Sequence, residues 1–217
     1  MNSPTLMDIL SRECSQITLE NRLKIEAFFN LLVAENKIQN LTRLSSPENF
    51  YFGHLRDVLE LEMSGWLENP PLDLGSGGGV PGLLSNCLHR RPWILVESEK
   101  KKAEFLKQAA ERLSFDQVRV INDRLEACIF RLEVGSVVVR AVGKVEKIYG
   151  WLSKCSTWNN LILFKGPGWD AEWDEFQSNK RLSKGLQLVE KRQYSVGPEE
   201  KSRTLIKLAR RLVSTQK

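Results

Sequence analysis

The feature that most constrains the fold of this chain is an alternation of short apolar segments with longer amphipathic segments from residue 70 onward. The short segments have the length and residue types of buried strands, and the longer ones repeat their apolar residues with a helical period. The expected strands cover residues 72–74, 93–96, 118–121, 136–139 and 161–164, followed by a hairpin over 186–196 and 204–209. Strands that alternate with helices predict an α/β fold, a mostly parallel sheet with helices on both faces.

The part of the chain before this pattern predicts helices only. Thr18 and Ser46 each precede a segment with helical spacing of apolar residues, and hydroxyl side chains at that position cap helix N-termini. Pro47, directly after Ser46, favours a helix start there. We therefore expect a helical N-terminal extension over residues 1–66, packed on a domain over residues 67–217, with the whole chain forming one unit.

Composition and charge exclude several classes of protein. The chain has 217 residues, 41% of them hydrophobic, and a formal net charge of +5, which predicts a globular protein and permits an anionic partner. No apolar run approaches the roughly 20 residues of a membrane span. The four cysteines are widely spaced without a Cys-x-x-Cys pair, so no zinc site is predicted. We expect a cytoplasmic monomer with no metal and no membrane partner.

A glycine-rich segment, LDLGSGGGVPG from Leu72 to Gly82, follows the first expected strand. Gly77, Gly79 and Gly82 match the dinucleotide-binding spacing of a nucleotide-dependent oxidoreductase. The spacing of Gly75, Gly77 and Gly79 after an acidic strand residue fits S-adenosylmethionine (SAM) instead. The Asp73 carboxylate would repel a pyrophosphate but suits the ammonium and sulfonium groups of SAM, so we favour SAM. A glycine turn without a ligand is the remaining alternative.

Polar residues at the ends of the second and third strands extend this candidate site, because ligands of such sheets bind outside the carboxyl ends of the strands. Glu97 and Ser98 end the second strand, where a carboxylate can accept hydrogen bonds from both ribose hydroxyls. After the third strand, polar groups of residues 122–126 can reach an adenine amine while Leu125 packs on the ring. A capped loop without ligand contacts is an equal alternative for that segment.

Basic residues end the fourth and fifth strands, Arg140 in one case and Lys165 in the other. Either residue alone is more often a solvated surface charge. Two cations at the ligand edge of one sheet, however, suit a substrate that carries phosphate. We therefore expect an anionic substrate such as a nucleic acid.

No general base or nucleophile stands out in the sequence. None of the cysteines ends the fourth or fifth strand, so a covalent adduct with a pyrimidine is not predicted. His54 lies beside apolar residues on a helix, so we favour a structural role, with a role in the cleft as the alternative. The N7 atom of guanine carries a free lone pair and needs no deprotonation before it attacks a methyl sulfonium. Catalysis would then consist mainly of alignment and electrostatics.

These motifs together resemble those of the bacterial 16S rRNA (guanine-N7) methyltransferases, the RsmG or GidB family. The resemblance rests on LDLGSGGGVPG, ILVESEKKKAEFLKQ, RLEA, VVRAVGKVEK and LFKGP in this order, with Asn40-Leu41-Thr42 and His54-x-x-Asp57 upstream. It covers nearly the whole chain. It implies a class I SAM-dependent methyltransferase with a Rossmann-like, mostly parallel seven-stranded sheet, acting on a guanine in the decoding-region loop of small-subunit rRNA.

The resemblance also implies roles for individual residues. It implies SAM contacts from Gly75, Val80, Leu125, Glu126 and Arg140, with Glu97 and Ser98 on the ribose side. Combined with the residues argued above, the expected cofactor site is Asp73, Gly75, Gly77, Gly79, Val80, Glu97, Ser98, Leu125, Glu126 and Arg140. The expected catalytic residues are Arg140 and Lys165, and the expected partner is 16S rRNA of the small ribosomal subunit. The alternatives are a nucleotide-binding oxidoreductase and a SAM-binding, RNA-associated protein without catalysis.

Overall fold

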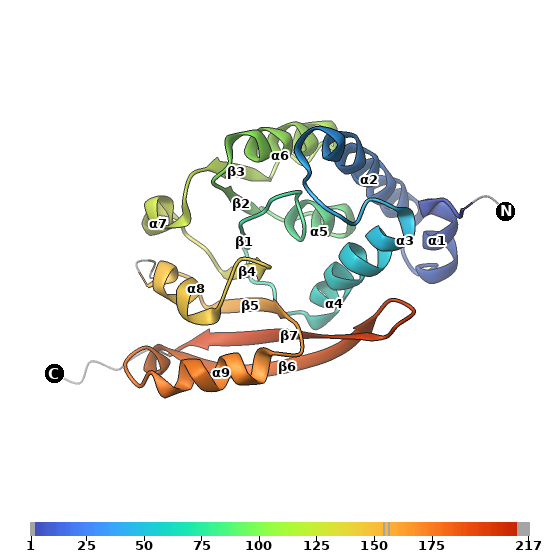
Figure 1. The fold of residues 1–217 in the computed structure, drawn as a ribbon. Helices are drawn as coiled ribbons and strands as arrows, with labels where there is room; N and C mark the ends of the chain where they lie inside the picture. Colours follow the sequence, from blue (N-terminus) through green and yellow to red (C-terminus); the bar gives the residue numbers. More distant parts are fainter. Residues whose placement is uncertain (1–2, 154, 156, 212–217) are drawn as a thin grey trace.

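The structure is a computed structural model that describes residues 3–153, 155 and 157–211. Its centre is a seven-stranded sheet with the strand order β3-β2-β1-β4-β5-β7-β6 (Figure 1). The strands are β1 (Leu72–Leu74), β2 (Ile94–Glu97), β3 (Arg119–Asn122), β4 (Ser136–Arg140), β5 (Asn160–Lys165), β6 (Leu186–Val196) and β7 (Lys201–Arg210). The first five run parallel, and β7 is antiparallel to both of its neighbours. The predicted α/β class is confirmed, and the order reverses between β1 and β4, where such sheets bind ligands.

Helices cover both faces of the sheet (Figure 1). One face carries α1 (Leu6–Glu13), α2 (Leu19–Gln39), α3 (Pro47–Phe50), α4 (Arg56–Ser64), α5 (Gly82–Leu88) and α6 (Lys100–Arg112). The other face carries α7 (Leu125–Cys128), α8 (Val145–Leu152) and α9 (Trp169–Ser178). Short helical turns η1 (Tyr51–Leu55), η2 (Ile129–Arg131) and η3 (Ser183–Gly185) complete the description.

The two faces of the sheet bury separate apolar cores, because successive strand side chains point to opposite sides. In β4, Val138 belongs to the core beneath α1–α6, whereas Val137 and Val139 belong to the core beneath α7–α9. Such a strand is apolar on both sides, which is why it appears in the sequence as an unbroken run of valines.

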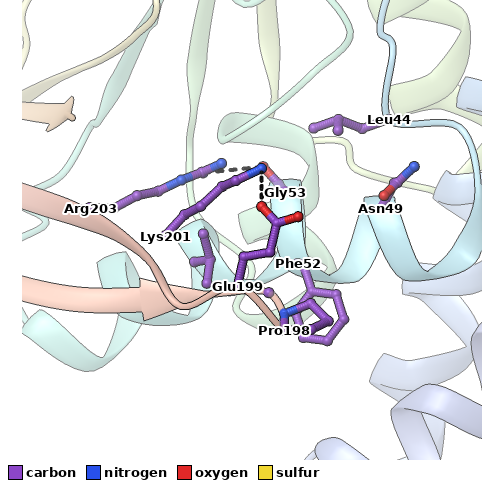
Figure 2. Close-up of a pocket in the computed structure, with 10 residues that line it drawn as sticks. Leu44, Asn49, Phe52, Gly53, Pro198, Glu199, Lys201 and Arg203 are labelled. Atoms are coloured by element: carbon purple, nitrogen blue, oxygen red, sulfur yellow. Dashed lines mark hydrogen bonds and ion pairs between the residues drawn. The ribbon is translucent and has the colours of Figure 1, made fainter. Parts of the chain in front are cut away.

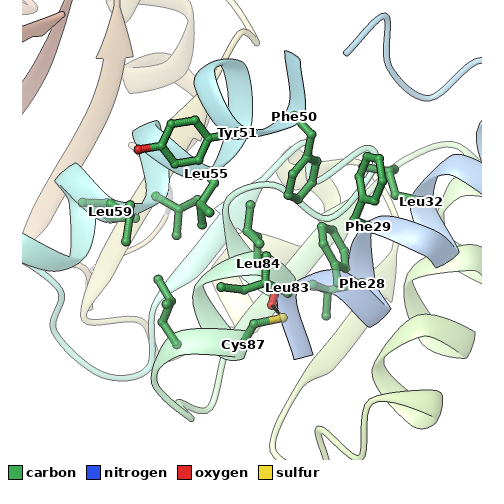
Figure 3. Packing of buried hydrophobic residues seen from close by; sticks show 14 of the residues in the cluster. Phe28, Phe29, Leu32, Phe50, Tyr51, Leu55, Leu59, Leu83, Leu84 and Cys87 are labelled. Carbon is green, nitrogen blue, oxygen red and sulfur yellow. Dashed lines mark hydrogen bonds between the residues drawn. The ribbon is translucent and has the colours of Figure 1, made fainter. Parts of the chain in front are cut away.

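The N-terminal helices share the first core with the sheet and do not form a core of their own. Phe28 and Phe29 of α2 pack around Phe50 of α3, with the rings of Phe29 and Phe50 centred 4.9 Å apart, and Leu83 and Leu84 of α5 close the cluster (Figure 3). Each such side chain contributes about 1.5–3 kcal/mol when fully buried.

The predicted helix caps are present. The Thr18 hydroxyl accepts a hydrogen bond from the Asn21 N–H at 3.2 Å, and the Ser46 hydroxyl accepts one from the Asn49 N–H at the same distance. The π-helical turn η1 joins α3 to α4 within the helix expected after Ser46. This turn sets the direction of the helical segment that reaches the carboxyl edge of the sheet.

The terminal hairpin brings distant residues to the same edge. Thr204 of β7 pairs with Lys165 of β5, and Arg203 of β7 pairs with Tyr194 of β6. The outer strand β6 carries charged side chains from Glu190 to Arg192, which discourage pairing with another sheet edge. The hairpin therefore adds Tyr194 and Arg203 to the ligand edge formed by the parallel strands.

Candidate functional site

The glycine-rich loop joins the end of β1 to the start of α5. The Gly75 N–H and the Ser76 N–H both donate to the Val96 carbonyl, at 2.9 and 3.2 Å, which holds the loop against β2. Gly77 has a φ of +50°, and the nearest atom to the position of a Cβ there, the Gly75 carbonyl oxygen, lies 3.9 Å away. A side chain at this position would be strained and would occupy open space, so the loop leaves room for a ligand.

Asp73 lies beneath this loop. Asp73 is only 1% exposed, and its Oδ2 accepts a hydrogen bond from the Gly82 N–H at 2.9 Å. Burial raises the pKa of the Asp73 carboxyl to about 7. Asp73 is therefore shielded from solvent and hydrogen-bonded to the start of α5.

Glu97 connects the loop to the ends of β2 and β3. Its Oε2 accepts from the Gly77 N–H at 2.9 Å, and its Oε1 accepts from the Glu99 N–H at 2.8 Å. The Asn122 amide donates to the Glu97 carbonyl at 2.9 Å. A carboxylate has about four acceptor positions, so Glu97 retains capacity for ligand hydroxyls while it fixes the loop.

A hollow of about 270 Å³ opens beside the loop, over the ends of β1, β2 and the segment after β3. Its lining residues are Leu74, Gly75, Val96, Ser98, Asp123, Arg124, Leu125, Glu126, Val142 and Trp151. We call it the cofactor hollow. The structure thus brings together four residues that the sequence assigned to one site, Gly75, Ser98, Leu125 and Glu126.

Other expected cofactor residues lie outside the lining of the cofactor hollow. Gly77 and Gly79 are in the loop beside it, and a Cβ at Gly79 would meet Leu83 at 2.9 Å. Val80 packs against the core of the helical face. Val142 and Trp151 also line the hollow and were not expected from the sequence. Val142 closes the hollow above Gly75, since a Cβ placed on Gly75 would lie 2.9 Å from the Val142 side chain. The only signal for Val142 in the sequence is its position shortly after the fourth strand.

Arg140, at the end of β4, is held by the η1 turn and α4. Its Nε donates to Asp57 Oδ2 at 3.0 Å, its Nη2 donates to the Gly53 carbonyl at 2.6 Å, and its Nη1 lies 2.9 Å from His54 Nδ1. The side chain is 18% exposed. All three guanidinium nitrogens therefore have partners within the protein, and Arg140 ties the N-terminal helices to the sheet.

Asp57 is the centre of this cluster. Its carboxylate also accepts from the Tyr194 hydroxyl at 2.8 Å and forms an ion pair with Arg203. Neither Tyr194 nor Arg203 was expected from the sequence, because only the hairpin register places them here. With two arginines for one buried carboxylate, the cluster carries a net positive charge.

His54 is structural, as expected. Burial and the neighbouring arginines lower the pKa of His54 to about 3, so the imidazole is neutral. Its Nε2 lies 2.9 Å from the Thr42 hydroxyl, and its Nδ1 faces Arg140. With Nδ1 accepting from Arg140 and Nε2 donating to Thr42, neither nitrogen is available to remove a substrate proton.

A second, larger hollow of about 580 Å³ adjoins Arg140 at the ends of β4, β5 and β7. We call it the acceptor hollow; its lining residues are Asp57, Arg140, Ala141, Phe164, Lys165, Gly166, Pro167, Lys201, Ser202 and Arg203. Ala141 lines it, and the next residue, Val142, lines the cofactor hollow. Adjacent residues of the loop that follows β4 therefore line the two hollows.

Lys165 lines the acceptor hollow but is already paired. Its ammonium lies 2.7 and 3.0 Å from the two Glu172 carboxylate oxygens and donates to the Gly143 carbonyl at 2.9 Å. Val145 is the first residue of α8, and its N–H donates a hydrogen bond to the Glu172 carboxylate at 2.6 Å. Lys165 and Glu172 therefore fix the loop between β4 and α8, which contributes a residue to each hollow.

Two negative findings concern the described residues. Within residues 3–153, 155 and 157–211, no group of three or more His, Cys, Asp or Glu side chains is placed to hold a metal ion. In the same part of the chain, no helix combines the length and the apolar character that crossing a bilayer requires.

Comparison with solved structures defines the class of the fold. The chain superimposes on a mutant of MtNAS in complex with S-adenosylmethionine with a TM-score of 0.58 and 17% identity, covering 94% of this chain and 82% of that one. It superimposes on the METTL16 MTase domain with a TM-score of 0.53 and 12% identity, covering 70% and 81%. The fold is therefore the Rossmann-like fold of class I SAM-dependent methyltransferases.

Comparison of sequences defines the family. The family model described as GidB, rRNA small subunit methyltransferase G, matches residues 21–200, and the chain belongs to this family. A relative from Orientia tsutsugamushi, named ribosomal RNA small subunit methyltransferase G, is 29% identical over 159 residues, which cover 72% of this chain and 78% of the relative. A relative of the same name from Sphingopyxis alaskensis is 33% identical over 140 residues, 64% of this chain and 60% of the relative.

Proposed function

We propose that this protein transfers a methyl group from SAM to N7 of a guanine in the decoding-region loop of 16S rRNA. The observation that carries the proposal is that adjacent residues of one loop, Ala141 and Val142, line two hollows at the carboxyl edge of the sheet, and that the second hollow has arginine and lysine side chains around it. Membership of the GidB family supports the reaction and its substrate, and does not favour an oxidoreductase.

The residues of the cofactor hollow fit SAM. Leu125, Val142 and Trp151 provide apolar surface for a purine, and Ser98 and Glu126 provide polar groups at its edge. The open space at Gly77 admits a ligand close to the backbone, and Asp73 supplies negative potential for a cationic ligand. When bound, SAM supplies an electrophilic methyl group on a sulfonium.

The contribution of the chain to the reaction is alignment. Guanine N7 needs no deprotonation, and the neutral, fully partnered His54 is not required as a base. The loop between β4 and α8 is held by Lys165 and Glu172, and its residues Ala141 and Val142 each line one of the two hollows. Holding two reactants at near-attack distance is a large source of rate acceleration.

The acceptor hollow suits an RNA substrate. Lys201 and Arg203 border it from β7, and Arg140 borders it from β4. Because Asp57 is shared between two arginines, a phosphate can approach a site that retains positive charge. We propose that the protein acts in the cytoplasm, as a monomer, on 16S rRNA within the small ribosomal subunit.

The test compares small-subunit rRNA from a strain lacking this protein with rRNA from its parent. Mass analysis of nuclease fragments should show one N7-methylguanine in the decoding region of the parent and none there in the deletion strain. Restoration by the wild-type chain, but not by the Gly77→Leu variant, ties the signal to the cofactor loop. An unchanged N7-methylguanine signal in the deletion strain would rule out the proposed function.

A further inference from the structure

A third hollow, of about 270 Å³, lies between the start of the α3–η1 segment and the β6–β7 turn (Figure 2). Its lining residues are Leu44, Asn49, Phe52, Gly53, Val196, Gly197, Pro198, Glu199, Lys201 and Arg203. It shares Lys201 and Arg203 with the acceptor hollow and no residue with the cofactor hollow. Nothing in methyl transfer itself uses this hollow, and we call it the flanking hollow.

Part of the lining of the flanking hollow is apolar. Phe52 of η1 and Pro198 of the β6–β7 turn both line the hollow (Figure 2), with Leu44 and Val196 in the same lining. Aromatic faces of this kind stack nucleobases, and RNA recognition relies on bases splayed out of single-stranded loops.

Polar groups border the same space. Within the described part of the chain, the side-chain amide of Asn49 makes no hydrogen bond to protein, and it offers both donors and an acceptor to a base edge. The Glu199 carboxylate pairs with the Lys201 ammonium at 2.9 Å and keeps further acceptor positions for an exocyclic amine.

The cations lie at the junction between the flanking and acceptor hollows. Lys201 and Arg203 are two residues apart on β7, so their side chains leave the strand on the same face. Lys201 and Arg203 each line the flanking hollow as well as the acceptor hollow. Two bases in neighbouring hollows would be joined by one phosphodiester, and the positive charge lies where that phosphate would pass.

We infer that the flanking hollow binds the nucleotide next to the target guanine in the same RNA strand. The base stacks on Phe52 and Pro198, Asn49 contacts its edge, and the linking phosphate lies near Lys201 and Arg203. The inference rests on the proposed function, because it takes the acceptor hollow as the place of the target guanine.

The experiment uses Phe52→Leu, which keeps an apolar side chain but removes the aromatic face, and Phe130→Leu as a matched control. Phe130 is 59% exposed and lines none of the three hollows. With a 16S rRNA fragment as substrate, Phe52→Leu should raise KM for RNA roughly 5- to 100-fold, the range for loss of one stacked base. KM for SAM should stay unchanged, and Phe130→Leu should match the wild type.

Direct binding adds a second readout. Wild-type protein should bind an oligonucleotide with a guanine and one neighbour on each side more tightly than guanosine monophosphate, and Phe52→Leu should lose most of that gain. Asn49→Ala, which removes the amide and leaves the apolar wall in place, repeats the test independently. If Phe52→Leu unfolds at a lower temperature than the wild type, the RNA binding of Asn49→Ala decides whether the flanking hollow holds a nucleotide.

The outcomes separate the inference from the function beneath it. If the wild type methylates the rRNA fragment and both variants keep the wild-type KM for RNA, the flanking hollow is not a nucleotide site. If the wild type methylates no RNA, the proposed function fails. The oligonucleotide-binding comparison then decides by itself whether the flanking hollow binds a nucleotide.

Discussion

Asp73→Asn is expected to stabilise the protein at alkaline pH and to weaken its binding of SAM. Asparagine preserves the shape of the side chain and an oxygen that can accept from the Gly82 N–H, 2.9 Å from Asp73 Oδ2. It removes the buried negative charge. The two effects have opposite signs because the charge is unfavourable in the free protein and favourable beside a cation.

The magnitude follows from the pKa of the carboxyl. Burial raises the pKa of Asp73 from 3.8 to about 7. The folded protein thus holds this proton more tightly than the unfolded chain, and the free energy of unfolding falls as pH rises from about 4 to about 7. At about 1.4 kcal/mol for each pH unit, the full loss at pH 8 is on the order of 4 kcal/mol.

Urea unfolding of both proteins without SAM, between pH 4 and pH 8, measures this effect. The stability difference should be near zero at pH 4 and should favour Asp73→Asn by up to about 4 kcal/mol at pH 8. A difference that does not change with pH would refute the burial argument. Calorimetry with SAM at pH 8 should show weaker binding by Asp73→Asn, and wild-type affinity should fall as Asp73 is protonated.

Four further predictions follow from the same geometry. Gly77→Leu should abolish SAM binding in calorimetry while the protein remains folded by circular dichroism, because the side chain would fill the open approach at a φ of +50°; normal affinity would place the cofactor elsewhere. Arg140→Ala should cut methyl transfer strongly and also lower stability by about 3 kcal/mol, because it breaks a buried ion pair with Asp57; wild-type turnover in a methylation assay would remove Arg140 from the site. Tyr194→Phe should lower the free energy of unfolding by about 1.5–3 kcal/mol through loss of its 2.8 Å hydrogen bond to the Asp57 carboxylate, and equal urea midpoints would contradict this. Lys165→Ala should weaken RNA binding and lessen its salt dependence in titrations between about 50 and 200 mM salt; an unchanged salt slope would leave Lys165 only the structural role of fixing the β4–α8 loop.

The sequence predicted the sheet because its signals are local. The apolar runs of β4 and β5, the hydroxyl caps at Thr18 and Ser46, and the glycine segment each depend on neighbouring residues. Helix α1 was missed as a separate element, although Thr5 and Asp8 form a capping box at its start. The division of the chain at residue 66 stays a prediction.

The candidate site was predicted only where the strand ends define it. Gly75, Ser98, Leu125 and Glu126 meet in the cofactor hollow because parallel strands end at one edge. The contacts of Arg140 could not be predicted, since Asp57 lies 83 residues away. Likewise, Tyr194 is 137 residues from Asp57, and only the register of the hairpin joins them. Such pairings depend on tertiary structure and leave no periodic signal in the sequence.

The central claim is tested most directly by methyl transfer with purified components. The protein is incubated with SAM carrying a labelled methyl group and with small ribosomal subunits from cells that lack this modification. We expect label at N7 of a single guanine in the decoding region, and no label in the reaction with Gly77→Leu. Label absent from rRNA, or present on another base atom, would contradict it.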